Sequence, residues 1–183
     1  MKKIIFLTLV GIALLFTGCK SQQDPIAKEK ERAIKAVAAQ SLYEAAVKAL
    51  NQQNFVFEAD RLSYTNNKPE PVNPGSNFIS LSGEVANVEI FPRTLILDSS
   101  AIRDINVKGN ATNIEMKTDA KGNVTFKMYV KGTDIEATIT INMSNGKNNS
   151  TAIISPNFDG KTITLYGHLY EFETTKEYEE KTE

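Results

Sequence analysis

The spacing of apolar residues changes once along the chain, from a helical period to a strand period. Residues 26–51 are rich in Ala, Glu, Lys and Leu and contain no Gly or Pro. Asp24 can cap a helix here, with Pro25 at its first position. Apolar residues recur at helical spacing: Ile34, Ala38, Leu42, Ala45, Ala46 and Ala49. We therefore expect a helix whose small face packs on a sheet. A helix lying on a membrane surface is the alternative.

From Asn54 onward, apolar and polar residues alternate almost to the end of the chain. A first strand over residues 55–64 is expected to be bent or bulged. Residues 65–77, rich in Pro and Asn, then form a loop. Further strands are predicted at 78–82, 85–91, 94–97, 105–108, 112–118, 124–131, 135–143, 151–155 and 162–172.

Three predicted strands carry an unbroken apolar stripe opposite a polar one. The apolar positions are Ile114 and Met116, then Val124, Phe126, Met128 and Val130, then Ile135, Ala137, Ile139, Ile141 and Met143. One buried and one solvated face are typical of antiparallel sheets. The predicted fold is α+β, with one N-terminal helix packed on about nine mainly antiparallel strands. The sheet closes as a barrel or folds as a sandwich.

The N-terminus has the layout of a secretory signal. Lys2 and Lys3 precede an apolar run over residues 4–16, and Thr17 and Gly18 lead into Cys19. The run is too short to span a bilayer comfortably. Phe16 to Cys19 resemble the lipobox of bacterial lipoproteins, which implies cleavage before Cys19 and its acylation. We expect a signal peptide (1–18), a lipidated tether (19–25), one globular domain (26–173) and an acidic tail (174–183).

This resemblance also sets the expected location. Lys20 replaces the aspartate that retains enteric lipoproteins in the inner membrane, and no acidic export run follows Cys19. We therefore expect the periplasmic face of the outer membrane. Cleavage changes the charge balance from 21 − 22 = −1 to 19 − 22 = −3, which argues against a nucleic-acid partner.

The sequence offers little catalytic chemistry. His168 is the only histidine, and a Ser-His-Asp triad would have to use it, but no Gly-x-Ser-x-Gly nucleophile elbow is present. One histidine and one cysteine cannot form a zinc site, so no metal or cofactor is expected. Two facing carboxylates would suffice for a glycosidase. The candidates are Glu84, Glu89, Asp98, Asp104, Glu115, Asp134, Glu136, Asp159, Glu171 and Glu173.

The last strand is apolar or aromatic on both faces. Ile163, Leu165 and Leu169 alternate with a polar-tipped stripe. If the leucine face packs on the core, the stripe is a surface suited to a partner or ligand. Its members are Tyr166, His168, Tyr170 and Phe172. The alternative is that the N-terminal helix covers this stripe.

Short motifs resemble a known family over most of residues 35–172. They are the Ala-rich helix leading into residues 55–64, Phe91-Pro92-Arg93 after a strand, and the closing residues 164–169. This pattern is similar to a family of Bacteroides-group envelope lipoproteins that share a domain of unknown function, DUF4251. The resemblance implies no substrate and no catalytic residue.

Three functions remain open. The first is a non-enzymatic, lipid-anchored module that binds or scaffolds an envelope protein, and this is our main prediction. The second is a lipocalin-like carrier of a small hydrophobic ligand inside a barrel. The third is a hydrolase that uses paired carboxylates.

Overall fold

The computed structural model describes residues 25–64, 68–91, 105–133, 136–157 and 162–172. The chain divides into two compact units, Met1–Lys35 and Ala36–Glu183. Along the described chain the elements are α1 (Pro25–Asn51), β1 (Asn54–Tyr64), β2 (Glu70–Pro71), η1 (Pro74–Ser76), β3 (Asn77–Ser82), β4 (Val85–Ile90), β5 (Ile105–Thr118), β6 (Val124–Lys131), β7 (Glu136–Met143), β8 (Asn149–Pro156) and β9 (Ile163–Glu171).

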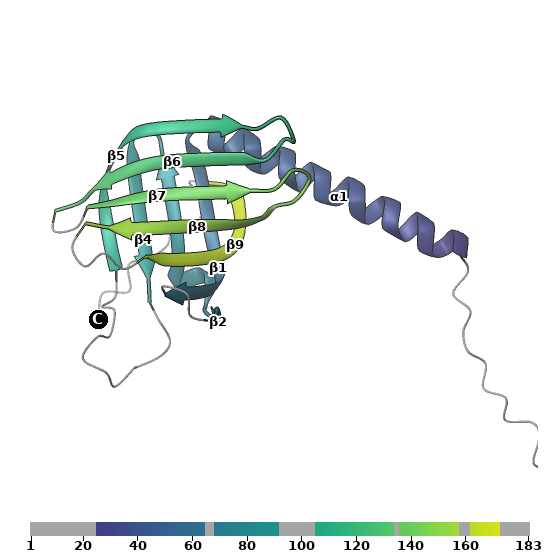
Figure 1. Cartoon of the computed structure of the whole chain (residues 1–183), viewed down its shortest axis with the longest axis horizontal. Helices are drawn as coiled ribbons and strands as arrows, with labels where there is room; N and C mark the ends of the chain where they lie inside the picture. The colour runs from purple at the N-terminus through teal and green to yellow at the C-terminus, as the bar shows by residue number, and fades with distance from the viewer. Residues whose placement is uncertain (1–24, 65–67, 92–104, 134–135, 158–161, 173–183) are drawn as a thin grey trace, which may run out of the picture. The chain divides into compact units, whose positions relative to one another are not determined.

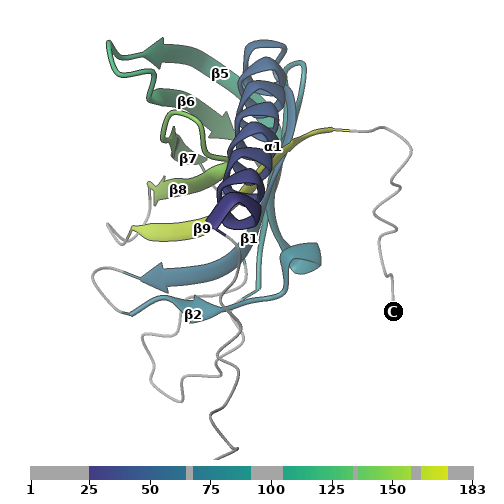
Figure 2. The same ribbon diagram turned by 90° about the vertical axis from the view of Figure 1, so that its right-hand side faces the viewer.

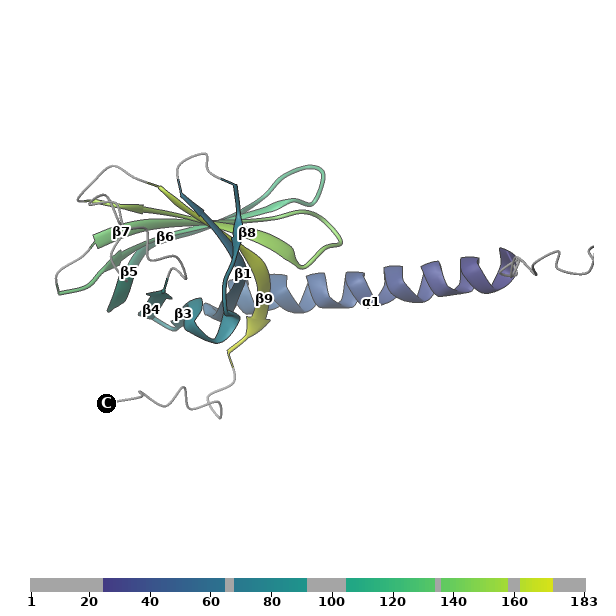
Figure 3. The ribbon, with the colours of Figure 1, turned by 90° about the horizontal axis from the view of Figure 1, so that it is seen from below.

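The strands form one antiparallel sheet in the order β2-β1-β3-β4-β5-β6-β7-β8-β9. Figure 1 shows β5 to β9 running side by side, and Figure 2 shows the short β2 beside β1. An additional pairing of β1 with β9 closes eight strands into a barrel, with β2 outside this ring. Figure 3 shows these two strands next to each other. The predicted α+β class is confirmed, and of the two predicted closures the barrel is the one formed.

The predicted strands agree with the structure except around β5, and the predicted loop 65–77 contains the short strand β2 and the turn η1. The sequence predicted two strands, 105–108 and 112–118, with residues 109–111 between them. The structure has one strand with a register shift between Thr112 and Glu115. Gly109 lies within this strand, and its lack of a Cβ atom allows the backbone of Lys131 to approach closely. The predicted strand 94–97 lies outside the described residues.

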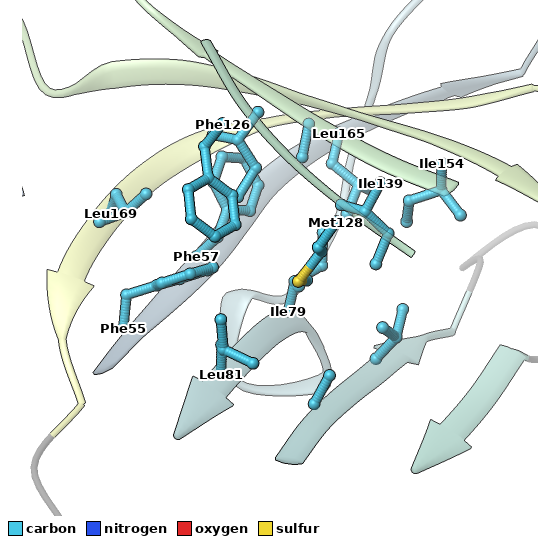
Figure 4. Packing of buried hydrophobic residues seen from close by; sticks show 14 of the residues in the cluster. Phe55, Phe57, Ile79, Leu81, Phe126, Met128, Ile139, Ile154, Leu165 and Leu169 are labelled. Atoms are coloured by element: carbon cyan, nitrogen blue, oxygen red, sulfur yellow. The ribbon is translucent and has the colours of Figure 1, made fainter. Parts of the chain in front are cut away.

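The inner face of the barrel is filled with large apolar side chains. Figure 4 shows residues from β1, β3, β6, β7, β8 and β9 pointing toward one another. Phe55 and Phe126 meet edge to face, with their ring centroids 5.3 Å apart. The alternation of β6 and β7 is confirmed: Val124, Phe126, Met128, Val130, Ala137, Ile139, Ile141 and Met143 are all buried. Partly buried Ile114 and Met116 pack against this core.

Helix α1 contributes a different face to the core from the one predicted. The residues that join the core are Tyr43, Ala46, Ala49 and Leu50. Ala46 and Ala49 were expected there, but Ile34, Ala38, Leu42 and Ala45 are exposed. The prediction weighted alanine and leucine spacing and overlooked Tyr43 and Leu50, whose larger side chains bury more apolar area.

The β5–β6 turn bonds α1 at one end of the barrel, and the β7–β8 turn is bonded to that turn. Tyr43 Oη donates a hydrogen bond of 2.6 Å to the carbonyl of Gly122, in the β5–β6 turn. Asn145, in the β7–β8 turn, donates its side-chain amide to the carbonyl of Lys121 at 3.0 Å. Asp119 accepts from the backbone N–H groups of Lys121 and Asn123. Among the described residues, no helix has the length and apolar character needed to cross a bilayer.

A candidate binding surface on β1 and β9

Strand β9 has one face inside the barrel and one face outside. Ile163, Leu165 and Leu169 are buried in the core, as the sequence predicted. The alternating residues Tyr166 and His168 are partly exposed, and Tyr170 is 43% exposed. Since successive side chains of a strand point to opposite faces, these three residues lie on the outer wall.

A bulge in β1 gives this outer wall its charged residues. Ala59 pairs with Gly167 and Arg61 pairs with Tyr166, so Asp60 is the extra residue of the bulge. Ala59 and Leu62 are both buried, and the two residues between them both face outward. Bulges often redirect side chains in this way. The bulge therefore places Asp60 and Arg61 side by side next to β9.

Gly167 allows β1 and β9 to come this close. A Cβ atom at this position would overlap with the carbonyl oxygen of Glu58. Asn148 holds the other edge of β9 by bonding both backbone groups of Leu169. Its amide nitrogen donates to the carbonyl at 2.9 Å, and its oxygen accepts from the N–H at 3.0 Å. The backbone of β9 is thus fixed on both sides, so that its outer side chains stand on a rigid support.

The outer side chains form one connected row. The Arg61 guanidinium carbon lies 5.3 Å from the ring centre of Tyr166, within cation–π range. Arg61 Nε lies 3.1 Å from Asp60 Oδ1. Asp60 Oδ2 lies 3.9 Å from His168 Nδ1. The His168 and Tyr170 rings stack with their centroids 6.5 Å apart. We call these five residues the β1–β9 surface.

Negatively charged residues surround the Tyr170 end of this surface. Partial burial raises the pKa of Tyr170, and the negative charges of Glu58 and Asp60 raise it further. Like an ordinary tyrosine, Tyr170 is protonated at neutral pH, so its hydroxyl is a hydrogen-bond donor. The surface presents donors on Arg61, Tyr166 and Tyr170, and an acceptor on Asp60. Such a mixture of aromatic and charged groups can bind a polar partner but offers no activated nucleophile.

The sequence named three of the five residues of this surface. It placed Tyr166, His168 and Tyr170 on one face, and the structure brings them together. Phe172 does not join the row: it follows the end of β9, and its backbone bonds Asn54. The possibility that α1 covers the stripe is wrong, since the buried face of α1 joins the interior core.

Sequence reasoning missed Asp60 and Arg61. The signal available was the alternation in β1, where Phe57 and Ala59 face inward and Glu58 and Asp60 face outward. That pattern shows which face Asp60 occupies but not which strand lies beside it. Only the pairing of β1 with β9, which are far apart in sequence, brings Asp60 to His168.

Of the ten carboxylates suggested for catalysis, three contact other side chains, five lie outside the described residues, and Glu84 and Glu171 are exposed. Glu136 accepts from the hydroxyl of Tyr129 and pairs with Lys131 at 3.3 Å. The Tyr129 hydrogen bond is the main cause that lowers the pKa of Glu136, which keeps it ionised and unsuited to acid catalysis. Glu115 pairs with Lys117, and Asn87 donates to Glu89. Asp98, Asp104, Asp134, Asp159 and Glu173 fall outside the described residues.

Metal binding finds no support in the described part of the chain. No three His, Cys, Asp or Glu side chains gather there in a group that could hold an ion. The lipidation residue predicted from the sequence, Cys19, lies outside the described residues.

Comparison with known proteins identifies the family. The profile of a domain of unknown function, DUF4251, matches residues 38–169. The crystal structure of a DUF4251 family protein from Bacteroides eggerthii DSM 20697 is similar, with a TM-score of 0.69 and 32% sequence identity. The match covers 74% of this chain and 91% of that chain. No curated protein sequence gives a significant match. The family resemblance found in the sequence motifs is confirmed: this chain belongs to the DUF4251 family.

Proposed function

We propose that this protein is a non-enzymatic, lipid-anchored module of the bacterial envelope that binds a protein partner through the β1–β9 surface. The observation that carries the proposal is the connected row of Tyr166, Arg61, Asp60, His168 and Tyr170 on the outer wall. Tyrosine and arginine are the residues that contribute most binding energy at protein interfaces.

The state of the barrel interior supports an outer rather than an inner binding site. An eight-stranded barrel is just wide enough to be filled by side chains or to hold one small ligand. Here Phe55, Phe57 and Phe126 are almost fully buried in the interior, together with Met128 and Ile139. A hydrophobic ligand would have to displace such groups. A lipocalin-like carrier is therefore the weaker proposal.

Native mass spectrometry of the protein, extracted gently from its own envelope, tests the proposal. We expect a co-purifying protein with the wild type. Arg61→Ala combined with Tyr170→Ala should lose it, because the variant removes a charged and an aromatic anchor. The matched control is Lys127→Ala, an exposed residue on the outer face of β6.

Each other outcome rejects the proposal in its own way. A small added mass on the wild type would favour the carrier. Loss of the partner in the Lys127→Ala control as well would show that the β1–β9 surface is not the specific site.

The anchor is a separate part of the proposal and has its own test. We propose that acylated Cys19 holds the mature protein at the periplasmic face of the outer membrane, as the lipobox resemblance implies. Three acyl chains would hold far more firmly than one, which binds only marginally. Cys19→Ala should remove the lipid mass and release the protein from the membrane fraction. Retention of lipidated protein in that variant would contradict the anchor.

A further inference from the structure

Strand β5 has an open edge along its second half. Its first half, up to Asn110, pairs with β4 on one side, and its second half pairs with β6 on the other. The last bond on the β4 side joins the N–H of Ala111 to the carbonyl of Glu84 at 2.7 Å. Figures 1 and 2 show this half of β5 at the rim of the sheet, with no described strand beyond it. We call residues 114–118 the β5 edge.

The backbone of the β5 edge directs hydrogen-bonding groups away from β6. Asp119, the next residue, donates its N–H to the carbonyl of Asn123 and accepts from the N–H of Gly122, so its backbone groups point toward the β6 side. Successive residues of an antiparallel strand direct these groups to opposite edges. Thr118 and Met116 therefore direct theirs outward. An open edge of this kind can pair with a further strand.

We propose that the β5 edge pairs with the β5 edge of a second copy of this chain. The two strands run antiparallel, and a two-fold axis passes between the two Met116 residues. These two residues exchange both of their backbone hydrogen bonds, and Glu115 of each copy lies opposite Lys117 of the other. Two-fold pairing of identical surfaces is the commonest arrangement in protein oligomers.

The charges of the β5 edge are complementary to themselves in this register. The side chains of Glu115 and Lys117 are 59% and 78% exposed, and they contact each other at 3.1 Å within one copy. Across the axis each meets its opposite charge at a non-hydrogen-bonded position, where facing side chains approach most closely. Moving the axis by one residue would place Glu115 opposite Glu115 or Lys117 opposite Lys117, which is destabilising. Charge therefore favours one register.

The opposite face of the β5 edge supports the same register. Ile114 and Met116 are partly buried and pack against the core, and Glu115 and Lys117 alternate with them on the other face. Pairing brings the two Met116 side chains together and places Ile114 opposite Thr118. Apolar cross-strand contacts of this kind add to the backbone hydrogen bonds.

This pairing goes beyond the proposed function and does not depend on it. Strands β6, β7 and β8 separate β5 from β9 on one side, and β3 and β4 separate it from β1 on the other. The β1–β9 surface therefore stays accessible in the pair, and either proposal can fail without the other.

Charge reversal in the full-length protein, followed by native mass spectrometry over a range of concentrations, tests the pairing. Glu115→Lys and Lys117→Glu each place two like-charged pairs across the axis, and we expect each to raise the dissociation constant of the dimer about tenfold or more. An equal mixture of both variants should dimerise again, because a strand with two positive charges then faces one with two negative charges. The control Lys108→Glu, at an exposed position of β5 that already pairs with β4, should dimerise like the wild type.

A disulfide tests the register itself. Met116→Cys places two thiols beside the axis, and the Cα atoms of a hydrogen-bonded antiparallel pair lie about 5.5 Å apart, within the range that a disulfide can bridge. We expect mild oxidation to crosslink this variant in its own envelope. The control variant Lys108→Cys and the wild type, which carries only Cys19, should not crosslink.

Three results would overturn the proposal. They are a wild type that stays monomeric at every concentration, dimers that persist in both reversed variants, and folded reversed variants that stay monomeric when mixed. Circular dichroism shows whether the variants are folded. If a reversed variant does not fold, the Met116→Cys crosslink decides instead, and its absence would overturn the proposal.

Discussion

The two faces of strand β9 have opposite roles. On the inner face, Ile163, Leu165 and Leu169 are almost completely buried and help to fill the barrel. On the outer face, Tyr166, His168 and Tyr170 keep part of their surface in water, and the first two contact charged residues of β1. The inner side chains determine whether the strand has a defined position. Because the strand is held in place, the outer side chains present their aromatic and polar groups in fixed positions.

Within this one strand, the inner-face residues therefore contribute mainly to folding stability and the outer-face residues mainly to binding. Burial of an aliphatic side chain contributes a few kcal/mol, whereas contacts between exposed charges contribute little. Substitutions on the inner face should therefore lower the free energy of unfolding. Substitutions on the outer face should weaken binding while the fold persists. The predictions below test this separation, beginning with the backbone that supports both faces.

Gly167→Ala should have the largest effect, because the added Cβ atom would overlap with the carbonyl oxygen of Glu58. The backbones of β1 and β9 must separate, so we expect a loss of about 3 kcal/mol or more, or failure to fold. Denaturant unfolding measures this loss. The control is Gly75→Ala, whose Cβ atom would meet only Asn73 Oδ1 at 3.6 Å. Equal stability of Gly167→Ala and the wild type would refute the close approach.

Leu165→Ala and Tyr170→Ala compare the two faces directly. The first leaves a cavity among fully buried groups, and we expect it to cost about 2–5 kcal/mol. The second truncates a side chain that is 43% exposed, and we expect it to cost about 1 kcal/mol or less. Thermal or urea unfolding of both variants measures the difference. If Tyr170→Ala cost as much as Leu165→Ala, the outer face would be part of the core.

The sequence predicted which face of each strand is buried better than it predicted which strands lie side by side. The strict alternation in β6, β7 and β9 showed which side chains would be buried, because a strand has only two faces. A helix has no such simple choice, and the core-facing side of α1 was partly misplaced. For the same reason, three of the five residues of the candidate surface were predicted. The alternation along β9 predicts which face Tyr166 occupies. Its contact with Arg61 forms only because β1 pairs with β9 and closes the barrel.

Tyr43→Phe tests how α1 is attached to the β5–β6 turn at one end of the barrel. The variant keeps the buried ring but removes the hydrogen bond to the carbonyl of Gly122. We expect a loss of about 0.5–1.5 kcal/mol, which is smaller than the loss for Leu165→Ala. Hydrogen exchange of the last turns of α1 should rise in the same variant. Unchanged exchange there would show that apolar packing alone holds the helix.

Acidification should produce the smallest of these effects, at the turn that receives α1. The side-chain amide of Asn123 is the main cause that lowers the pKa of Asp119 below its usual value of 3.8, and backbone N–H groups add to it. A lowered pKa in the folded state means that ionised Asp119 favours folding above about pH 4. This contribution is lost as the pH falls through the lowered value.

Carboxyl NMR titration and unfolding from about pH 5 to about pH 2 measure this effect. Asp119→Asn should show a shallower loss of stability over that range than the wild type. A folded-state pKa of Asp119 at or above 3.8 would contradict the hydrogen-bonded turn.

Site-specific photocrosslinking in the intact envelope tests the central claim most directly, namely that the outer face of β9 is where a partner binds. A benzophenone amino acid is placed at position 170 on the β1–β9 surface or at position 127 on the outer face of β6. We expect one discrete crosslinked protein from position 170, lost on Arg61→Ala, and none from position 127. The same products from both positions, or none from position 170, would contradict the claim.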